Sequence, residues 1–380
     1  MPQLQTTQLS LPPGMIHLGI GQPSPSLLPL DIMRRAATQR LNQPDSSLLA
    51  YGAEQGDGYF RETLAQLLSD QYGETVDPHN LFITAGASQS LDLISTIFTQ
   101  AGDTIFVEEP SYFLALRIFR DHRLKIVGVA MDEKGLDMND LEEKLALERP
   151  TFLYTIPTYH NPASVTLSHP RREQLVRMSR EYGFIIVADE VYQMLNYLEQ
   201  APRPLACWAE QGNMLSIGSF SKILAPGLRL GWIQGTRELL DRLIGCGLLD
   251  SGGGLNPFTS AIVRSTIEMG LLSSNIEHLK SVYGKRLGAL QAAIKEELAE
   301  AVSFNQPKGG FFMWVRLPDG VIAEDLLPTA RNNNVAFLPG NQFSCSGGMK
   351  NYMRLSFALY EEDDLQTGAR RLGKVLRSSG

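Results

Sequence analysis

Short apolar runs alternate with longer amphipathic runs between about residues 75 and 235. Runs rich in β-branched and aromatic residues predict buried strands. These strands are expected at 81–84, 104–109, 125–130, 151–157, 184–190 and 214–220. Near-continuous apolar strands separated by helices indicate an α/β fold, in which helices cover both faces of a parallel sheet. In such a sheet, reactive groups gather at the carboxyl ends of the strands.

The rest of the chain has a different pattern. A long amphipathic helix is predicted over 278–302, and strands are predicted at "GGFFMWVRLP" and "NYMRLSFALY". This pattern indicates a smaller α+β lobe. We expect three parts: an N-terminal segment (1–45) that packs on the small domain, a large domain (46–268) and the small C-terminal domain (269–380).

Composition narrows the possible functions. A chain of 380 residues with 43% hydrophobic and 20% charged residues is typical of a globular protein. A net charge of -7 without a basic block argues against a nucleic-acid partner. The lack of a long apolar run or a signal-peptide pattern argues against a membrane location. The three cysteines, Cys207, Cys246 and Cys345, fit neither a metal site nor a disulfide framework, so we expect a reducing, cytoplasmic location.

The strand "FIIVADEVY" ends in a carboxylate at Asp189. Burying this group is costly without a partner. Asp189 either caps the following turn or faces a cationic atom of a ligand. Tyr192 follows three residues later, at a spacing that can place it on the same side of the turn.

Two further segments suggest an anion site. "TAGASQSL" places Gly86 and small residues at the start of a helix, where free amide groups bind anions, although ordinary capping by Ser88 is the alternative. "SIGSFSKILAPGLRLGW" contains Lys222 and Arg229. We expect Arg229, which is flanked by leucines, to be partly buried and paired with an anion. A salt bridge to a protein acid would also satisfy it.

Three more residues have both an ordinary and a functional interpretation. Asn161 in "IPTYHNP" follows a strand, where turn asparagines are common. Tyr112 in "EEPSYF" begins a helix and can simply belong to the core. Arg354 in "YMRLSFA" lies within an apolar strand, so it either bridges an internal acid or receives a ligand carboxylate.

Taken together, these residues match the needs of one cofactor. Pyridoxal phosphate requires an anion cradle for its phosphate, a lysine for its aldehyde and a carboxylate for its ring nitrogen. The sequence resembles the fold-type I, class I/II aminotransferases that use this cofactor, and it is most similar to the 2-aminoadipate and kynurenine aminotransferase branch. The resemblance covers nearly the whole chain. It rests on "FLYTIPTYHNP", "GSFSKILAPGLRLGW", "PKGGFFMWVRLP" and "NVAFLPGNQF".

The resemblance implies a large domain with a mostly parallel seven-stranded sheet between helices, and a smaller α+β domain. It also implies roles for individual residues. Lys222 would form the Schiff base and later move the proton, while Asp189 would hold the ring nitrogen. Tyr192 and Asn161 would bind the ring oxygen, and Tyr112 would stack on the ring. The other cofactor contacts are expected from Gly86, Ala87, Ser88, Gln89, Ser219, Ser221 and Arg229.

The resemblance further implies an obligate homodimer with shared active sites, in which Tyr51 reaches the phosphate of the neighbouring subunit. Arg354 would receive the α-carboxylate of the substrate, with Asn161 and Gly21 beside it. The expected reaction moves an amino group from an amino acid to a 2-oxo acid with ping-pong kinetics, and 2-oxoglutarate is the expected acceptor.

The donor side chain is less defined. Aspartate-type enzymes bring an arginine to the distal carboxylate from the region that corresponds to "LLDSGGGLNPFTS", where this chain has none before Arg264. Arg34 or Arg35 could serve instead, but solvated helix charge explains both. We therefore expect a broad donor range, with aromatic, 2-aminoadipate-like or long aliphatic side chains.

Two alternatives remain open at this point. One is a lyase that uses the same cofactor for β-elimination or decarboxylation. The other is a pyridoxal-phosphate-sensing regulator, which would carry an N-terminal helix-turn-helix. The segment before "MIHLGIGQP" offers no room for such a module, so the sequence favours an aminotransferase over a regulator.

Overall fold

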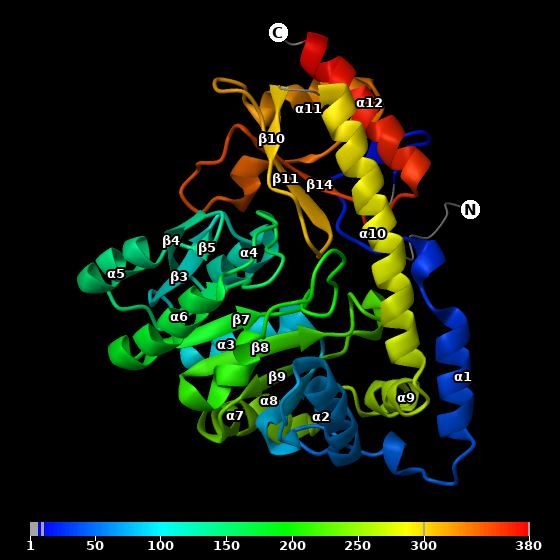
Figure 1. Ribbon diagram of the computed structural model, residues 1–380. Helices are drawn as coiled ribbons and strands as arrows, with labels where there is room; N and C mark the ends of the chain where they lie inside the picture. The colour runs from blue at the N-terminus through cyan, green and yellow to red at the C-terminus, as the bar shows by residue number, and fades with distance from the viewer. Residues whose placement is uncertain (1–6, 9–10, 299–300, 379–380) are drawn as a thin grey trace.

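A large mixed sheet forms the centre of the molecule (Figure 1). The computed structural model describes residues 7–8, 11–298 and 301–378. Within them the sheet has the order β2-β9-β8-β7-β6-β3-β4-β5. The strands are β2 (Leu81–Thr84), β3 (Thr104–Glu109), β4 (Lys125–Asp132), β5 (Gly135–Leu136), β6 (Phe152–Thr155), β7 (Ile185–Asp189), β8 (Met214–Ser219) and β9 (Gly231–Gly235).

The inner strands of this sheet, from β4 through β8, pair in parallel. Strand β9 is antiparallel to both of its neighbours, and β5 is antiparallel to β4. The predicted α/β fold with a mostly parallel sheet is therefore confirmed. The short β5 extends the sheet beyond the expected seven strands to eight among the described residues.

Helices cover both faces of the sheet, which explains why β6 and β7 are apolar and buried at nearly every position. Side chains of one face pack against α3, α4, α7 and α8, and those of the other face pack against α5, α6 and the turn η4. The bounds are α3 (Ala87–Phe98), α4 (Phe113–Asp121), α5 (Met138–Leu147), α6 (His169–Tyr182), α7 (Arg237–Ile244), α8 (Gly247–Gly252) and η4 (Leu205–Gln211).

A second, antiparallel sheet lies in the upper part of Figure 1, next to two long helices. Its order is β10-β11-β14-β13. The elements of this region are β10 (Ser303–Phe304), β11 (Phe312–Arg316), β12 (Val335–Ala336), β13 (Leu338–Pro339), β14 (Tyr352–Ser356), η7 (Gly340–Phe343), α10 (Leu271–Leu298), α11 (Ala323–Asn332) and α12 (Glu362–Ser378). The predicted α+β lobe is thus confirmed.

Helix α10 begins earlier than the predicted start at residue 278. The polar "SSN" interrupts the apolar periodicity of the first turns and hides them from a pattern search. A tertiary contact explains their helical form, because buried Asn275 donates a hydrogen bond to the carbonyl of Ile223 at 2.9 Å. Residues 299–300, within the predicted helix, lie outside the described residues.

The N-terminal segment contacts both parts of the molecule. Strand β1 (Ile16–His17) pairs with β12 in the region of the small sheet. Helix α1 (Leu30–Leu41) lies along α9 (Pro257–Glu268), where Arg40 donates hydrogen bonds to Ser265 and Glu268. The next elements are η2 (Ser47–Leu49) and α2 (Gly58–Tyr72), which is capped by Asp57. The division into domains at residues 45 and 268 stays a prediction.

One close contact between β8 and β9 lies just before the loop that carries Lys222. Gly218 pairs with Trp232, and a Cβ atom on Gly218 would lie 2.0 Å from the Trp232 ring. Because the indole is held among buried side chains, it has little room to move. Any side chain at position 218 therefore has to push the two strands apart.

We predict that Gly218→Ala lowers the free energy of unfolding by about 1–3 kcal/mol or more, since overpacking of a filled core costs this much. Denaturant unfolding measures the change. Gly247→Ala is the matched control, because a Cβ there meets no atom within 4 Å and should change stability by less than about 0.5 kcal/mol. Equal effects of the two substitutions would contradict the packing argument.

Candidate active site

The candidate residues meet where the parallel strands end. Asp189 is the last residue of β7, Ser219 is the last residue of β8, and Asn161 follows β6. From the other side, β14 of the small sheet brings Arg354 into contact with Asn161. The site therefore lies between the two sheets, and neither sheet completes it alone.

Lys222 lies in the loop after β8 with its amine in an apolar and cationic environment. Its Nζ is 5.3 Å from the ring centre of Phe311 and 5.8 Å from that of Tyr192. The carbonyl of Gly21 accepts a hydrogen bond from Nζ at 3.4 Å. Burial and the nearby Arg354 guanidinium lower the pKa of Lys222 to about 8. A neutral, nucleophilic amine is thus far more accessible than on a surface lysine.

Asp189 has one satisfied and one unsatisfied carboxylate oxygen. Oδ2 accepts a hydrogen bond from the Tyr154 hydroxyl at 2.8 Å. Oδ1 is buried and has no hydrogen-bond partner among the described residues. Burial raises the pKa of Asp189 to about 6, while the Tyr154 bond opposes this increase. The open oxygen of a buried carboxylate is the acceptor that a protonated ring nitrogen requires.

Arg354 is 3% exposed and has no carboxylate partner among the described residues. It donates hydrogen bonds to Asn161 Oδ1 at 2.8 Å and to the Gly19 carbonyl at 2.7 Å, and its Nε is unsatisfied. The guanidinium lies 3.9 Å from the ring centre of Phe312. Burial lowers the pKa of Arg354 to about 10. A buried guanidinium without an anion is costly, so this one is poised for a ligand carboxylate.

An anion cradle forms at the start of α3. Gly86 has a φ of +92°, which favours glycine, and a Cβ atom there would lie 3.0 Å from the Arg229 guanidinium. The guanidinium therefore lies next to the helix N-terminus, where free amides of Ala87 and Ser88 are available. The Ser219 hydroxyl accepts a hydrogen bond from the Ser221 amide at 3.1 Å.

The predicted partial burial of Arg229 is wrong, because its side chain is exposed. The turn η5 (Pro226–Leu228) ends in a left-handed conformation at Arg229, with a φ of +46°. This conformation turns the side chain out of the apolar run. No protein acid pairs with it within the described chain, so its guanidinium is available to an external anion.

Three further predicted residues, Tyr192, Tyr112 and Gln89, lie at or near the site. Tyr192 is buried, and Tyr112 is half-buried at the start of α4. The charges of Asp189 and Arg354 act on both tyrosines, and burial raises the pKa of Tyr112 to about 12. Gln89 accepts a hydrogen bond from the Ala85 amide and so spans the turn before α3.

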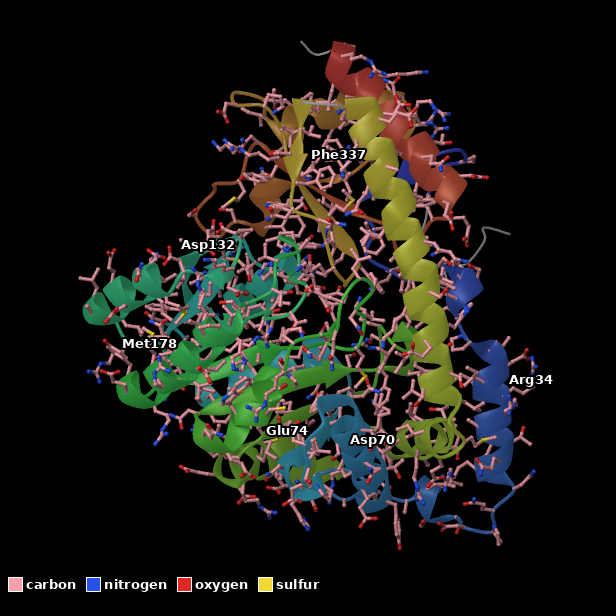
Figure 2. The ribbon with its side chains drawn as sticks, in the orientation of Figure 1. Arg34, Asp70, Glu74, Asp132, Met178 and Phe337 are labelled. Carbon is pink, nitrogen blue, oxygen red and sulfur yellow. The ribbon has the colours of Figure 1, made fainter. Side chains whose placement is uncertain are left out.

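Three predicted candidates lie apart from this cluster. Tyr51 is 87% exposed and, in the described chain, forms no contact with the other site residues. Arg34 and Arg35 are exposed on α1, and Figure 2 shows Arg34 at the outer edge of the molecule. Arg34 pairs with Asp31, as expected for solvated helix charge.

Two residues of the site were not anticipated. Tyr154 lies within the quoted strand "FLYTIP", and Phe312 lies within "GGFFMWVRLP". The apolar pattern of each strand predicts only that Tyr154 and Phe312 belong to the core. Their contacts with Asp189 and Arg354 depend on which strands are neighbours, and the sequence pattern does not specify strand order.

The geometry meets the requirements of pyridoxal phosphate. The cradle of Gly86 and Arg229 suits a phosphate, the open Oδ1 of Asp189 suits the ring nitrogen, and the Lys222 amine lies in the same site. Arg354 adds a place for the carboxylate of a substrate. The donor set therefore fits the cofactor that the sequence implies.

Comparison with known proteins agrees with this geometry. The model of the family "Aminotransferase class I and II" matches residues 13–372. The aromatic-amino-acid aminotransferase 1 of Thermococcus litoralis is 34% identical over 369 residues, 96% of this chain and 88% of that protein. The 2-aminoadipate transaminase of Thermus thermophilus is 34% identical over 376 residues, 97% of this chain and 92% of that protein.

A solved structure is also similar. The crystal structure of kynurenine aminotransferase from Pyrococcus horikoshii has a TM-score of 0.91 and 32% identity, and the match covers 96% of this chain and 91% of that one. These matches confirm the resemblance seen in the sequence. The protein is an amino-acid transaminase that uses pyridoxal phosphate, and the chain belongs to the class I and II aminotransferases.

Proposed function

We propose that this aminotransferase acts through Lys222 and Arg354, with 2-oxoglutarate as an acceptor. The observation that carries the proposal is the buried guanidinium of Arg354, which lacks a carboxylate partner among the described residues. Both amino acids and 2-oxo acids carry an α-carboxylate. One guanidinium can therefore hold the donor and the acceptor in turn, as a ping-pong reaction requires.

Each side chain has a distinct task in this proposal. Lys222 would hold the cofactor through its amine. Once freed by the substrate, the same amine would take the proton from the α-carbon of the amino acid and deliver it to the former aldehyde carbon. Asp189 would accept a hydrogen bond from the ring nitrogen of the cofactor and keep that nitrogen protonated. When bound, pyridoxal phosphate supplies an electron sink for the bond that breaks at the α-carbon. Arg354 and the backbone near Gly21 would orient the substrate.

The other residues fix the cofactor in place. We assign the ring oxygen to Tyr192 and Asn161, the ring face to Tyr112, and the neighbourhood of the substrate carboxylate to Asn161 and Gly21. Gly21 is suited to this place because a Cβ atom there would lie 2.6 Å from the Phe312 ring. The phosphate contacts are assigned to Gly86, Ala87, Ser88, Gln89, Ser219, Ser221 and Arg229.

The donor is proposed to have an aromatic, 2-aminoadipate-like or long aliphatic side chain. The names of the two relatives described above support the aromatic and the 2-aminoadipate-like donors. Three aromatic rings surround Arg354, at 3.9 Å for Phe312, 4.9 Å for Phe343 and 5.8 Å for Phe113, and they give this side of the site an apolar character. A lyase reaction is not favoured, because the named relatives are aminotransferases.

A homodimer with shared active sites is part of the proposal. Apolar side chains are exposed at one end of the molecule, around η2, α2, α8 and α9. These side chains are Leu49, Tyr51, Tyr59, Leu248 and Phe258. Monomeric proteins seldom expose several apolar side chains side by side. We therefore propose that a second copy of the chain buries these five in a dimer interface. Tyr51 would then act in the partner's site.

We also propose a cytoplasmic location. The three cysteines are free, which suits a reducing compartment. No helix within the described chain has the length and apolar character needed to cross a membrane.

Lys222→Ala should lower kcat by at least about a thousandfold, because both the covalent anchor and the proton carrier are lost. The visible absorbance of the lysine-bound cofactor should also disappear. Lys125→Ala, which removes an exposed lysine paired with Glu148, is the control and should leave both unchanged. Full transaminase activity in the Lys222 variant would refute the assignment.

Arg354→Ala should raise the KM of amino acid and 2-oxo acid by about a hundredfold, while the affinity for the cofactor changes little. Removing one member of a buried charge pair with a ligand costs several kcal/mol, which justifies this magnitude. Arg316→Ala is the control, since Arg316 pairs with Asp319 at the exposed end of β11. Equal losses of substrate and cofactor affinity would exclude a role in substrate binding.

The shared-site proposal can be tested with mixed dimers of Tyr51→Phe and Lys222→Ala chains. If Tyr51 acts in the partner's site, each mixed dimer has one intact site and one site with both changes. Such dimers should bind cofactor at half of their sites with the affinity of the unmodified enzyme. Reduced affinity at every site would place Tyr51 in its own subunit's site, and an unchanged cofactor affinity in the Tyr51→Phe homodimer would place it outside the site altogether.

A further inference from the structure

Tyr154 is a fully buried tyrosine of the central strand β6, and the transaminase assignment gives it no task. It pairs in register with Val187 on β7 and with Val107 on β3. Alternation along β7 places Asp189 on the same face as Val187, diagonal to Tyr154. A long aromatic side chain spans this diagonal, so its hydroxyl reaches Asp189 Oδ2 at 2.8 Å.

The ring of Tyr154 has little freedom. It is 0% exposed, and the Phe119 ring of α4 packs edge-on against it, with 5.4 Å between ring centres. The hydroxyl is therefore held at one place, and the carboxylate oxygen bonded to it is held too. Asp189 Oδ1 is left as the open oxygen.

The Tyr154 hydroxyl donates its hydrogen bond to a carboxylate. Tyr197, for comparison, donates its hydroxyl to the Gly310 backbone carbonyl at 2.6 Å, which satisfies the hydroxyl without involving a charge. A phenylalanine at position 154 would fill the same space. The hydroxyl is thus needed for the carboxylate rather than for the packing.

We propose that Tyr154 is a positioning residue for the cofactor: its hydroxyl fixes the Asp189 carboxylate and favours its charged form, which leaves Oδ1 for the ring nitrogen. The inference rests on the proposed role of Asp189. The direction of the electrostatics agrees with it, because the Tyr154 hydrogen bond opposes the rise in the pKa of Asp189 that burial causes.

The test compares two cofactors on the full-length enzyme, from which the bound cofactor has been removed. One is pyridoxal phosphate, and the other is its analogue with a carbon atom in place of the ring nitrogen. The dissociation constant of the analogue divided by that of pyridoxal phosphate measures how strongly the protein recognises that nitrogen. A large ratio means strong recognition. Tyr154→Phe should reduce this ratio about tenfold, equivalent to about 1.4 kcal/mol, through weaker binding of pyridoxal phosphate alone.

Tyr197→Phe is the matched control, because it removes a hydroxyl of the core that does not contact Asp189, and it should leave the ratio unchanged. A purely structural role of Tyr154 predicts equal losses for both cofactors. That result, or an unchanged ratio in Tyr154→Phe, would overturn the inference.

Asp189→Asn separates this inference from the proposed function. If Asp189 holds the ring nitrogen, the Asn variant loses the preference for pyridoxal phosphate, and adding Tyr154→Phe to it reduces the ratio no further. A normal ratio in Asp189→Asn would refute the role of Asp189 itself. A further drop in the double variant would show that Tyr154 acts independently of Asp189 and would refute the inference.

A second measurement applies even if Tyr154→Phe lowers the yield of folded enzyme. With saturating cofactor, kcat should fall about tenfold, while the KM of the amino acid stays within about twofold, because Arg354 is untouched. A rise in KM alone would contradict a role at the cofactor ring.

Discussion

The site depends on charged groups that are buried without being neutralised by one another. Arg354 and Asp189 both lie in a low-dielectric interior, but they form no ion pair with each other. Burial raises the pKa of Asp189 and lowers that of Arg354, so in both cases it favours the neutral form. This is the physical cost of keeping a charge ready for a ligand. The wholly buried strands β6 and β7 and the helices on both faces supply the stability that offsets this cost.

Sequence reasoning succeeded where a general rule of sheet topology applies. Asp189 and Asn161 lie at one edge of the sheet, as their places at the ends of apolar strands predict. The cofactor contacts of Asn161 and Ser219 were implied only by the family resemblance. Sequence reasoning failed where the role of a residue depends on its tertiary contacts. The alternation of β6 marks Tyr154 as a core residue, but its contact with Asp189 depends on β6 and β7 being neighbours.

Local backbone conformation explains why Arg229 is exposed although its neighbours predict burial. Arg229 lies between leucines, and its neighbours predicted burial, yet a left-handed turn directs it outward. The start of α10 was hidden by polar residues that a distant carbonyl satisfies. The first feature is a local backbone conformation and the second is a contact between segments far apart in the chain. A periodicity analysis detects neither of them.

Leu18 and Gly19 contact residues that follow them by more than 300 positions in the sequence. The Gly19 carbonyl accepts a hydrogen bond from Arg354, 335 positions later, and the Leu18 carbonyl accepts one from the Ser356 amide. During synthesis the N-terminal segment leaves the ribosome long before β14 exists. The part of the site that holds Arg354 can therefore form only after β14 has been synthesised, whereas β7, β8 and the loop that carries Lys222 are available to fold earlier.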